Sequence, residues 1–183
     1  TKEKFDIVYD LQSSDRTSIY NFFININNSC MWSGNRKGGR FKYHPDNFED
    51  IPVLDRLLHQ LRLIGLEVNL TPDLTWMDKD ILEYIPKNKF IILIPGSSVH
   101  LKHKRWPSKN FGELAVGLEK KGYEIVVIGT DDERQEIETI KSYSSTIYDY
   151  SNKDLSFLAA LCRKSAGVVA NDTGPTFIAG AVD

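Results

Sequence analysis

Two serines and a lysine that follow one apolar run could bind an anion. The run is Phe90-Ile-Ile-Leu-Ile94, and Pro95-Gly96 ends it. Ser97 and Ser98 come next, and Lys104 follows in a basic stretch. Hydroxyl and ammonium groups donate hydrogen bonds that phosphate oxygens accept, so this segment suits a phosphate ligand. The alternative is an ordinary strand-to-helix connection with its lysines in solvent.

Polar residues at the end of a second apolar run could bind the sugar of a nucleotide. Gly129 and Thr130 close this run, and three acids follow at 131–133. An acid at this place in a nucleotide-binding fold often accepts hydrogen bonds from ribose hydroxyls. The alternatives are a helix start, where the dipole favours acids, and a divalent metal site.

A third polar group, Asn171-Asp-Thr-Gly-Pro175, comes just before a predicted helix of small residues at 176–181. The first amide N–H groups of a helix have no partner within the helix, and the helix dipole is positive at that end. Thr173 and Gly174 could therefore hold an anion. Asp172 has the alternative role of capping the helix.

Apolar runs alternate with amphipathic segments in the second half of the chain, which predicts strands that alternate with helices. Strands are predicted at 90–94, 123–129, 146–149 and 166–170, and helices after Pro107, after Thr130, at 152–162 and at 176–181. This order gives a parallel sheet covered on both faces, with right-handed crossovers. The three polar groups then meet at the carboxyl edge of the sheet, where together they describe a nucleotide diphosphate site.

The first half of the chain predicts a second, smaller α/β part. Residues 5–11 and 30–33 are typical of strands, and a polar turn after the first of them leads into a helix. From Asn47 to Ile64 apolar residues recur every three or four positions, which predicts an amphipathic helix with one face on a core. The fold class is therefore α/β, with parallel sheets in two Rossmann-like parts.

The segment between the two parts contains proline and lysine residues that favour a domain boundary. Residues 78–84 allow a short helix, and Pro and Lys cluster at 85–89. We place the boundary there, so that the first domain spans 1–86 and the second spans 87–183.

Composition narrows the function classes. The 183 residues are 41% hydrophobic, enough for a real core, and the formal charge of -2 disfavours extended nucleic-acid binding. No apolar run approaches the roughly 20 residues that span a bilayer, and no cleavable signal peptide is visible. Cys30 and Cys162 are far apart and suggest neither a disulfide framework nor a metal site. We therefore expect a cytoplasmic protein.

Several motifs of other protein classes are missing. The basic stretch 34–40 lacks the spacing of a phosphate-binding P-loop, and no Gly-x-Gly-x-x-Gly follows a strand, which disfavours an oxidoreductase. His59, His100 and His103 have no further ligand at metal spacing, so no metal site is expected. Trp106 either packs under its loop or stacks on a base, and packing is the favoured interpretation.

Four of these segments together resemble glycosyltransferase family 9, the ADP-heptose:lipopolysaccharide heptosyltransferases of the GT-B fold. They are Ile94-Pro-Gly-Ser-Ser98, Lys104-Arg-Trp-Pro107, Val126-Val-Ile-Gly129 and Asn171-Asp-Thr-Gly-Pro175. The first half agrees more loosely, through Tyr-Asp-Leu-Gln within residues 6–12 and through Leu63-Ile-Gly65.

The resemblance implies two Rossmann-like domains, with the sugar nucleotide on the second one. It also implies inverting transfer of heptose from ADP-heptose to the lipopolysaccharide core, without a metal and without a cofactor other than the donor substrate. The expected partners are the donor and the lipopolysaccharide-core acceptor, with no nucleic acid. At most a peripheral contact with the inner face of the inner membrane is expected.

The resemblance also assigns roles to residues by their position. Ser97, Ser98 and Lys104 would hold the pyrophosphate, and Lys104 would stabilise the departing diphosphate. The remaining expected nucleotide-sugar contacts are Gly129, Thr130, an acid near Glu133 for the ribose, and Asp172, Thr173, Gly174 and Pro175 for the phosphates and sugar.

The chain departs from the family in two ways. Phe177 stands where the family usually has a histidine, so the donor could be a different nucleotide sugar. The family is also much longer, so we expect the catalytic base before Thr1 and further helices after Asp183. A fragment of this kind favours donor binding over turnover, and a non-catalytic nucleotide-sugar-binding module remains the alternative from another class.

Overall fold

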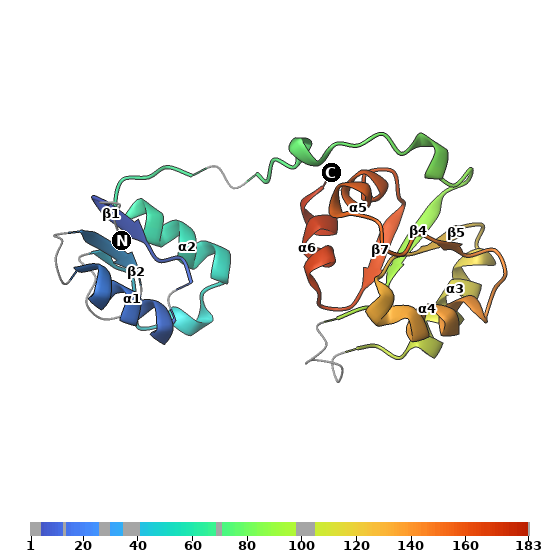
Figure 1. Cartoon of the computed structure of the whole chain (residues 1–183), viewed down its shortest axis with the longest axis horizontal. Helices are drawn as coiled ribbons and strands as arrows, with labels where there is room; N and C mark the ends of the chain where they lie inside the picture. The colour runs from blue at the N-terminus through green and yellow to red at the C-terminus, as the bar shows by residue number, and fades with distance from the viewer. Residues whose placement is uncertain are drawn as a thin grey trace. The chain divides into compact units, whose positions relative to one another are not determined.

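The computed structural model describes residues 5–12, 14–25, 30–34, 41–68, 71–97 and 105–182. The chain forms two compact units, Thr1–Leu70 and Thr71–Asp183 (Figure 1). Each unit contains a parallel β-sheet with helices packed against it. The predicted α/β fold class is therefore confirmed.

The first unit is built on a small parallel sheet. Its elements are β1 (Ile7–Tyr9), α1 (Asp15–Asn25), β2 (Met31–Gly34), β3 (Phe41–Lys42), the 3-10 turn η1 (Phe48–Asp50) and α2 (Val53–Arg62), and the strand order is β1-β2-β3. Helix α2 begins later than the apolar pattern predicts, because Pro52 is its N-cap and lacks the amide of a continuing helix. Strand β3 was not predicted, because two residues are too few for a pattern.

Helix α2 is fixed to the first sheet by one buried side chain. Gln60 is 2% exposed, and its Nε2 atom donates to the carbonyl oxygens of Asp10 and Ser33, at 3.1 Å each. Asp10 directly follows β1, and Ser33 lies in β2 opposite Tyr9. The Ser33 carbonyl also accepts from the Asp10 amide at 2.7 Å, so the amide of Gln60 adds a side-chain donor at the edge of the ladder between β1 and β2.

The second unit has the alternation of strands and helices that the sequence predicts. Its elements are β4 (Phe90–Ile94), α3 (Ser108–Glu119), β5 (Glu124–Val127), the 3-10 turn η5 (Asp131–Glu133), α4 (Arg134–Lys141), β6 (Tyr148–Asp149), α5 (Leu155–Cys162), β7 (Gly167–Ala170) and α6 (Gly174–Ala181). All strand pairs are parallel, in the order β6-β5-β4-β7. Strands β5 and β6 therefore lie on one side of β4, and β7 lies on the other side.

Both faces of the second sheet are buried. Helices α3 and α4 cover one face, and α5 and α6 cover the other (Figure 1). Ile92 and Ile94 pack on the α5 side with Phe157, whereas Leu93 packs on the α3 side with Phe111. Because successive side chains of a strand point to opposite faces, an uninterrupted apolar strand such as β4 supplies both cores.

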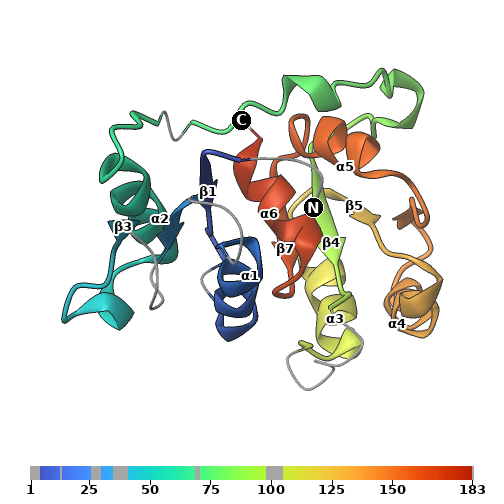
Figure 2. The same ribbon diagram turned by 60° about the vertical axis from the view of Figure 1, so that its left-hand side comes forward.

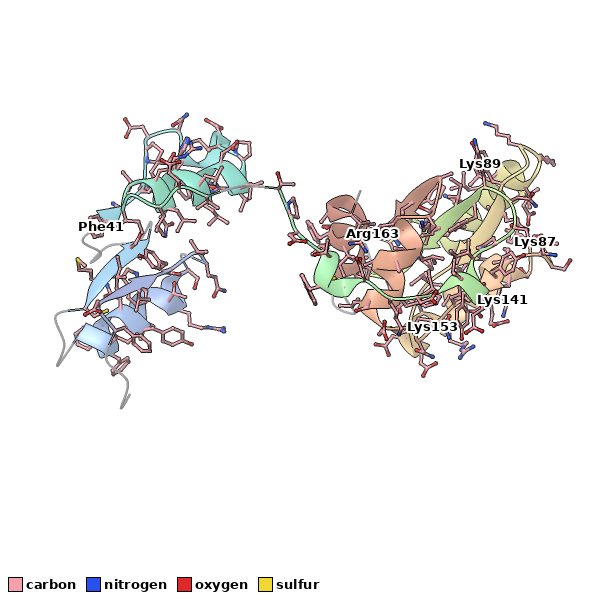
Figure 3. The ribbon with its side chains drawn as sticks, turned by 90° about the horizontal axis from the view of Figure 1, so that it is seen from above. Phe41, Lys87, Lys89, Lys141, Lys153 and Arg163 are labelled. Atoms are coloured by element: carbon pink, nitrogen blue, oxygen red, sulfur yellow. The ribbon has the colours of Figure 1, made fainter. Side chains whose placement is uncertain are left out.

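The segment before β4 belongs to the second unit, so the units divide after Leu70 rather than at 86. Arg163, labelled in Figure 3, donates to Asp78 Oδ1 at 2.6 Å and to the Leu74 carbonyl oxygen at 2.9 Å. Ile81 is buried in the core that contains α5. Instead of one short helix, this segment has two 3-10 turns, η2 (Thr75–Met77) and η3 (Leu82–Tyr84).

Both units contain one buried cysteine, and neither contains a described helix that could span a membrane. Cys30 and Cys162 are buried, free thiols. Burial raises the pKa of the Cys162 thiol to about 11, which makes the thiolate unfavourable at neutral pH. Among the residues that the structure describes, no helix is both long and apolar enough to cross a bilayer.

Two glycines of α3 provide a matched test of core packing. A Cβ atom at Gly112 would lie 2.6 Å from Tyr143 Cγ, whereas a Cβ at Gly117 would meet nothing within 4 Å. We expect Gly112→Ala to lower the free energy of unfolding by about 1–3 kcal/mol through overpacking. Gly117→Ala should raise it by up to about 1 kcal/mol through helix propensity. Urea unfolding of both variants measures the two changes, and equal effects would contradict the packing described here.

The N-cap of α5 provides a test that depends on pH. Asp154 Oδ2 pairs with Lys79 Nζ at 2.6 Å and Oδ1 accepts from the Phe157 amide at 2.7 Å, so its pKa lies below the ordinary aspartate value. The stabilisation is therefore complete above that ordinary value and is lost as the pH falls through the lower, folded-state pKa. We expect thermal unfolding of Asp154→Asn to depend less on pH between about 6 and 3 than that of the wild type. An unchanged slope would contradict this assignment.

Candidate functional site

The candidate site lies where β4 and β7 end side by side. Ile94 pairs with Ala170 in the parallel register, and the Asn171 amide donates to the Ile94 carbonyl at 3.2 Å. Figure 2 shows the two strands next to each other, with α6 against β7. The crossovers leave β4 in opposite directions at this point, and ligands of open α/β sheets bind at such a reversal of strand order. Two of the three predicted polar groups begin at this point.

Asn171 ties the loop after β4 to the loop after β7. Its side chain donates from Nδ2 to the Pro95 carbonyl oxygen at 2.6 Å and accepts at Oδ1 from the Trp106 amide at 2.9 Å. The residue is 7% exposed, so both bonds are shielded from water. Asn171 thereby holds both ends of the segment between Pro95 and Trp106. The sequence interpretation included Asn171 in a motif but gave it no role.

Ser97 is buried at the start of this segment and is bound by Arg105. The Ser97 hydroxyl accepts from Arg105 Nε at 3.0 Å, and the Ser97 carbonyl accepts from Nη2 at 2.7 Å. The serine therefore already has a cationic neighbour within the protein. Its predicted contact with a pyrophosphate stays a prediction.

The loop after β5 approaches the same segment through Glu133. The amide and hydroxyl of Thr130 both donate to Glu133 Oε2, at 2.9 and 2.7 Å, in a capping box. Glu133 Oε1 lies 3.5 Å from Arg105 Nη2. A Cβ atom at Gly96 would lie 2.9 Å from Glu133 Cδ, so the backbone of the first loop packs directly on this side chain. The structure thus brings Glu133 beside Ser97, while the ribose contact stays a prediction.

The loop after β6 also reaches this edge, which was not predicted. The Asn152 amide donates to the Gly129 carbonyl at 2.8 Å, and Asn152 Nδ2 donates to Asp131 Oδ1 at 3.0 Å. The bonds from Asn152 and from Arg134 lower the pKa of the Asp131 carboxyl. Asn152 has φ +58°, in the left-handed region that asparagine tolerates better than most residues. That tolerance is a weak signal of a turn and does not identify its partner in the sequence.

The third predicted group leads into α6. Thr173 is the N-cap residue, with extended backbone angles, and Pro175 lies in the first turn. Asp172 and Gly174 are exposed, and a Cβ at Gly174 would meet nothing within 4 Å. Asp172 is therefore not the N-cap residue of α6. The first amides of α6 lie at the edge where β4 and β7 end, as an anion site would require.

Trp106 packs at the beginning of α3. Its ring contacts Phe111 edge to face, with centroids 4.8 Å apart, and 42% of the residue is exposed. Trp106 therefore packs on Phe111 of α3, and stacking on a base stays untested.

Other expectations fall outside the described residues. Ser98, Lys104, His100 and His103 belong to this group, so the predicted approach of Lys104 to Ser97 and Thr173 stays a prediction. Of the histidines in the described part, His59 is bound through Nδ1 to the Tyr43 hydroxyl at 2.7 Å. Within the described ranges, no group of three or more His, Cys, Asp or Glu side chains is arranged to hold a metal ion.

Comparison with known families gives one match that covers the chain. The family described as "Glycosyltransferase family 9 (heptosyltransferase)" matches residues 1–183. A comparison with curated protein sequences finds no match.

Solved structures share the fold. A family 9 glycosyl transferase from Veillonella parvula is 21% identical, with a TM-score of 0.70 over 98% of this chain and 55% of its own. The E. coli heptosyltransferase WaaC, solved with ADP-2-deoxy-2-fluoro heptose, is 16% identical, with a TM-score of 0.70 over 98% of this chain and 59% of its own. The iron-containing dodecameric glycosyltransferase TibC from enterotoxigenic E. coli is 16% identical, with a TM-score of 0.52 over 83% and 38%. The chain spans somewhat more than half the length of the first two.

The two bonds of Asn171 predict a large effect of its removal. Asn171→Ala leaves the Pro95 carbonyl and the Trp106 amide without this partner, which should lower the free energy of unfolding by roughly 2–4 kcal/mol. Asn88→Ala, at an exposed position before β4, should change it by less than about 0.5 kcal/mol. Urea unfolding compares the two variants, and similar values would contradict the role given to Asn171.

Proposed function

The chain belongs to glycosyltransferase family 9, and on this premise we propose that it carries the donor-binding part of an enzyme that transfers a heptose, or a related sugar, from ADP-heptose. The acceptor in this proposal is the lipopolysaccharide core, at the inner face of the inner membrane. The observation that carries the proposal is the meeting of the loops after β4, β5 and β7 at one edge of the second sheet.

The site suits a ligand with a diphosphate next to a ribose. The amides at the start of α6 and the lysine at position 104 would bind the phosphate oxygens, and Glu133 Oε1 would accept a ribose hydroxyl. Glu133 Oε2 already takes two bonds from Thr130, which fixes the orientation of the carboxylate. A carboxylate held in this way needs little rearrangement when a sugar hydroxyl binds.

Sugar transfer leaves negative charge on the departing nucleotide diphosphate. Fixed donors and cations that are already aimed at this charge lower the barrier, because they need no reorganisation during the reaction. In the proposed mechanism Lys104 and the α6 amides do this work in place of a metal. We propose inverting transfer because of the resemblance to family 9, in which a single displacement by the acceptor inverts the anomeric carbon. TibC is described as iron-containing, so metal independence needs a direct test.

A second donor is favoured by one residue of α6. Phe177 is 73% exposed and follows Gly174 by three positions, so it lies almost one turn further along the helix. An exposed aromatic ring there offers an apolar face and no hydrogen-bond partner for sugar hydroxyls. The second candidate function is therefore transfer from another nucleotide sugar by the same site.

Calorimetry with the purified chain tests the donor site. We expect ADP and ADP-heptose to bind more tightly than UDP-sugars, and we expect no change when EDTA is added. Lys104→Ala should weaken ADP binding by about 10- to 100-fold, because a charge-assisted hydrogen bond to the diphosphate is lost. Lys109→Ala, at an exposed position of α3, is the matched control and should bind ADP normally.

Three results would count against the proposal. Tighter binding of a UDP-sugar than of ADP would remove the ADP-heptose assignment and favour the second candidate. Loss of binding in EDTA would contradict metal independence. Equal ADP affinities of the Lys104→Ala and Lys109→Ala variants would remove Lys104 from the site.

A further inference from the structure

We infer that Arg105 is a positioning residue that holds the loop after β4 against the beginning of α4. It thereby sets the distance between the phosphate side and the ribose side of the donor site. This inference rests on the proposed function, because the two sides are defined by the proposed ligand.

The guanidinium of Arg105 lies between two strand-end segments. On one side it binds Ser97, through Nε to the hydroxyl at 3.0 Å and through Nη2 to the carbonyl oxygen at 2.7 Å. On the other side Nη1 donates to Glu136 Oε1 at 2.6 Å, and Nη2 lies 3.5 Å from Glu133 Oε1. The guanidinium therefore links the loop after β4 to both η5 and α4.

These contacts occupy the guanidinium within the protein. The Arg105 side chain is 8% exposed, and Nε, Nη1 and Nη2 each donate a hydrogen bond to a protein oxygen. A rigid fork of donors that is satisfied on two sides is suited to fixing a geometry. Arg105 therefore acts on the ligand through the loops that it joins and not as a phosphate ligand itself.

The loop after β4 and η5 also touch each other directly. The Gly96 backbone packs against the Glu133 side chain, so the loop and the carboxylate touch directly. Without Arg105, Glu133 and Glu136 would lose the cation that the structure shows beside both of them. Ser97 would lose both of its bonds to the guanidinium, so this tie between the loop and α4 would be gone. Ser97 and Glu133 would then lose their fixed spacing, and a small misplacement of binding groups is enough to weaken a site strongly.

The most specific test removes Glu136, the partner of Arg105 on α4, and leaves every proposed ligand contact in place. Glu136→Ala deletes the carboxylate on α4, and Glu138→Ala, on the same helix with an exposed ion pair to Lys141, is the matched control. We expect Glu136→Ala to weaken ADP binding by about 3- to 30-fold and Glu138→Ala to leave it unchanged. Arg105→Lys should also weaken ADP binding, because a point charge cannot bridge both segments.

Two further measurements separate positioning from general stability. Hydrogen exchange of the backbone amides at 96–97 and 131–136, without nucleotide, should become faster in Glu136→Ala and Arg105→Lys. Arg163→Ala removes an arginine with two similar bonds at the C-cap of α5, and it should lower the unfolding temperature without changing ADP affinity. Urea unfolding shows which variants are folded at the temperature of the binding assay.

The outcomes distinguish this inference from the proposed function. Wild-type binding of ADP combined with unchanged affinity in Glu136→Ala and Arg105→Lys overturns the positioning role and leaves the proposed function intact. Unchanged hydrogen exchange in both variants overturns the link between the loop and α4. If the wild-type chain binds neither ADP nor ADP-heptose, the proposed function fails, and the positioning role for a donor fails with it.

Discussion

The pairing of β4 with β7 is the constraint on which the candidate site depends. Strand β4 lies between β5 and β7, so the chain crosses to one side of it through α3 and returns to the other side after α5. The loops that follow β4 and β7 therefore begin next to each other, although Pro95 and Asn171 are 76 residues apart. Asn171 converts this closeness into a fixed geometry, because its amide binds the first loop at both Pro95 and Trp106.

The fold of the second unit follows from its sequence because its strands are buried on both faces. An uninterrupted apolar run such as 90–94, followed by helices with apolar faces, is typical of a strand in a parallel sheet that helices cover on both sides. The first unit gives weaker signals, because β3 has only two residues. The packing of residues 71–85 on the second unit depends on Arg163 with Asp78 and on buried Ile81. Such contacts between distant segments leave no periodic pattern, so the sequence places the boundary too late.

For the candidate site, too, the sequence predicts some features and the structure is needed for the others. The positions of Ser97, Glu133 and Thr173 at strand ends follow from the alternation of strands and helices. The bonds that join the loops to one another do not, because Arg105 binds Glu136, 31 residues away, and Asn171 binds Trp106 and Pro95, 65 and 76 residues away. The sequence motifs show only that a polar residue stands at each of these two positions. They cannot say that one binds two glutamates and the other binds two backbone groups.

In the proposed site the adjacent cations Lys104 and Arg105 would have separate tasks. A buried guanidinium is stable only where oxygens satisfy its donors, and Ser97, Glu133 and Glu136 provide them. The same pairing matters for an anionic ligand, because two unpaired carboxylates at this edge would repel a diphosphate. Arg105 compensates one of these charges and leaves the second as a hydroxyl acceptor for a ribose. In the proposal the phosphates are left to Lys104, so the tether and the ligand contact would not compete for one side chain.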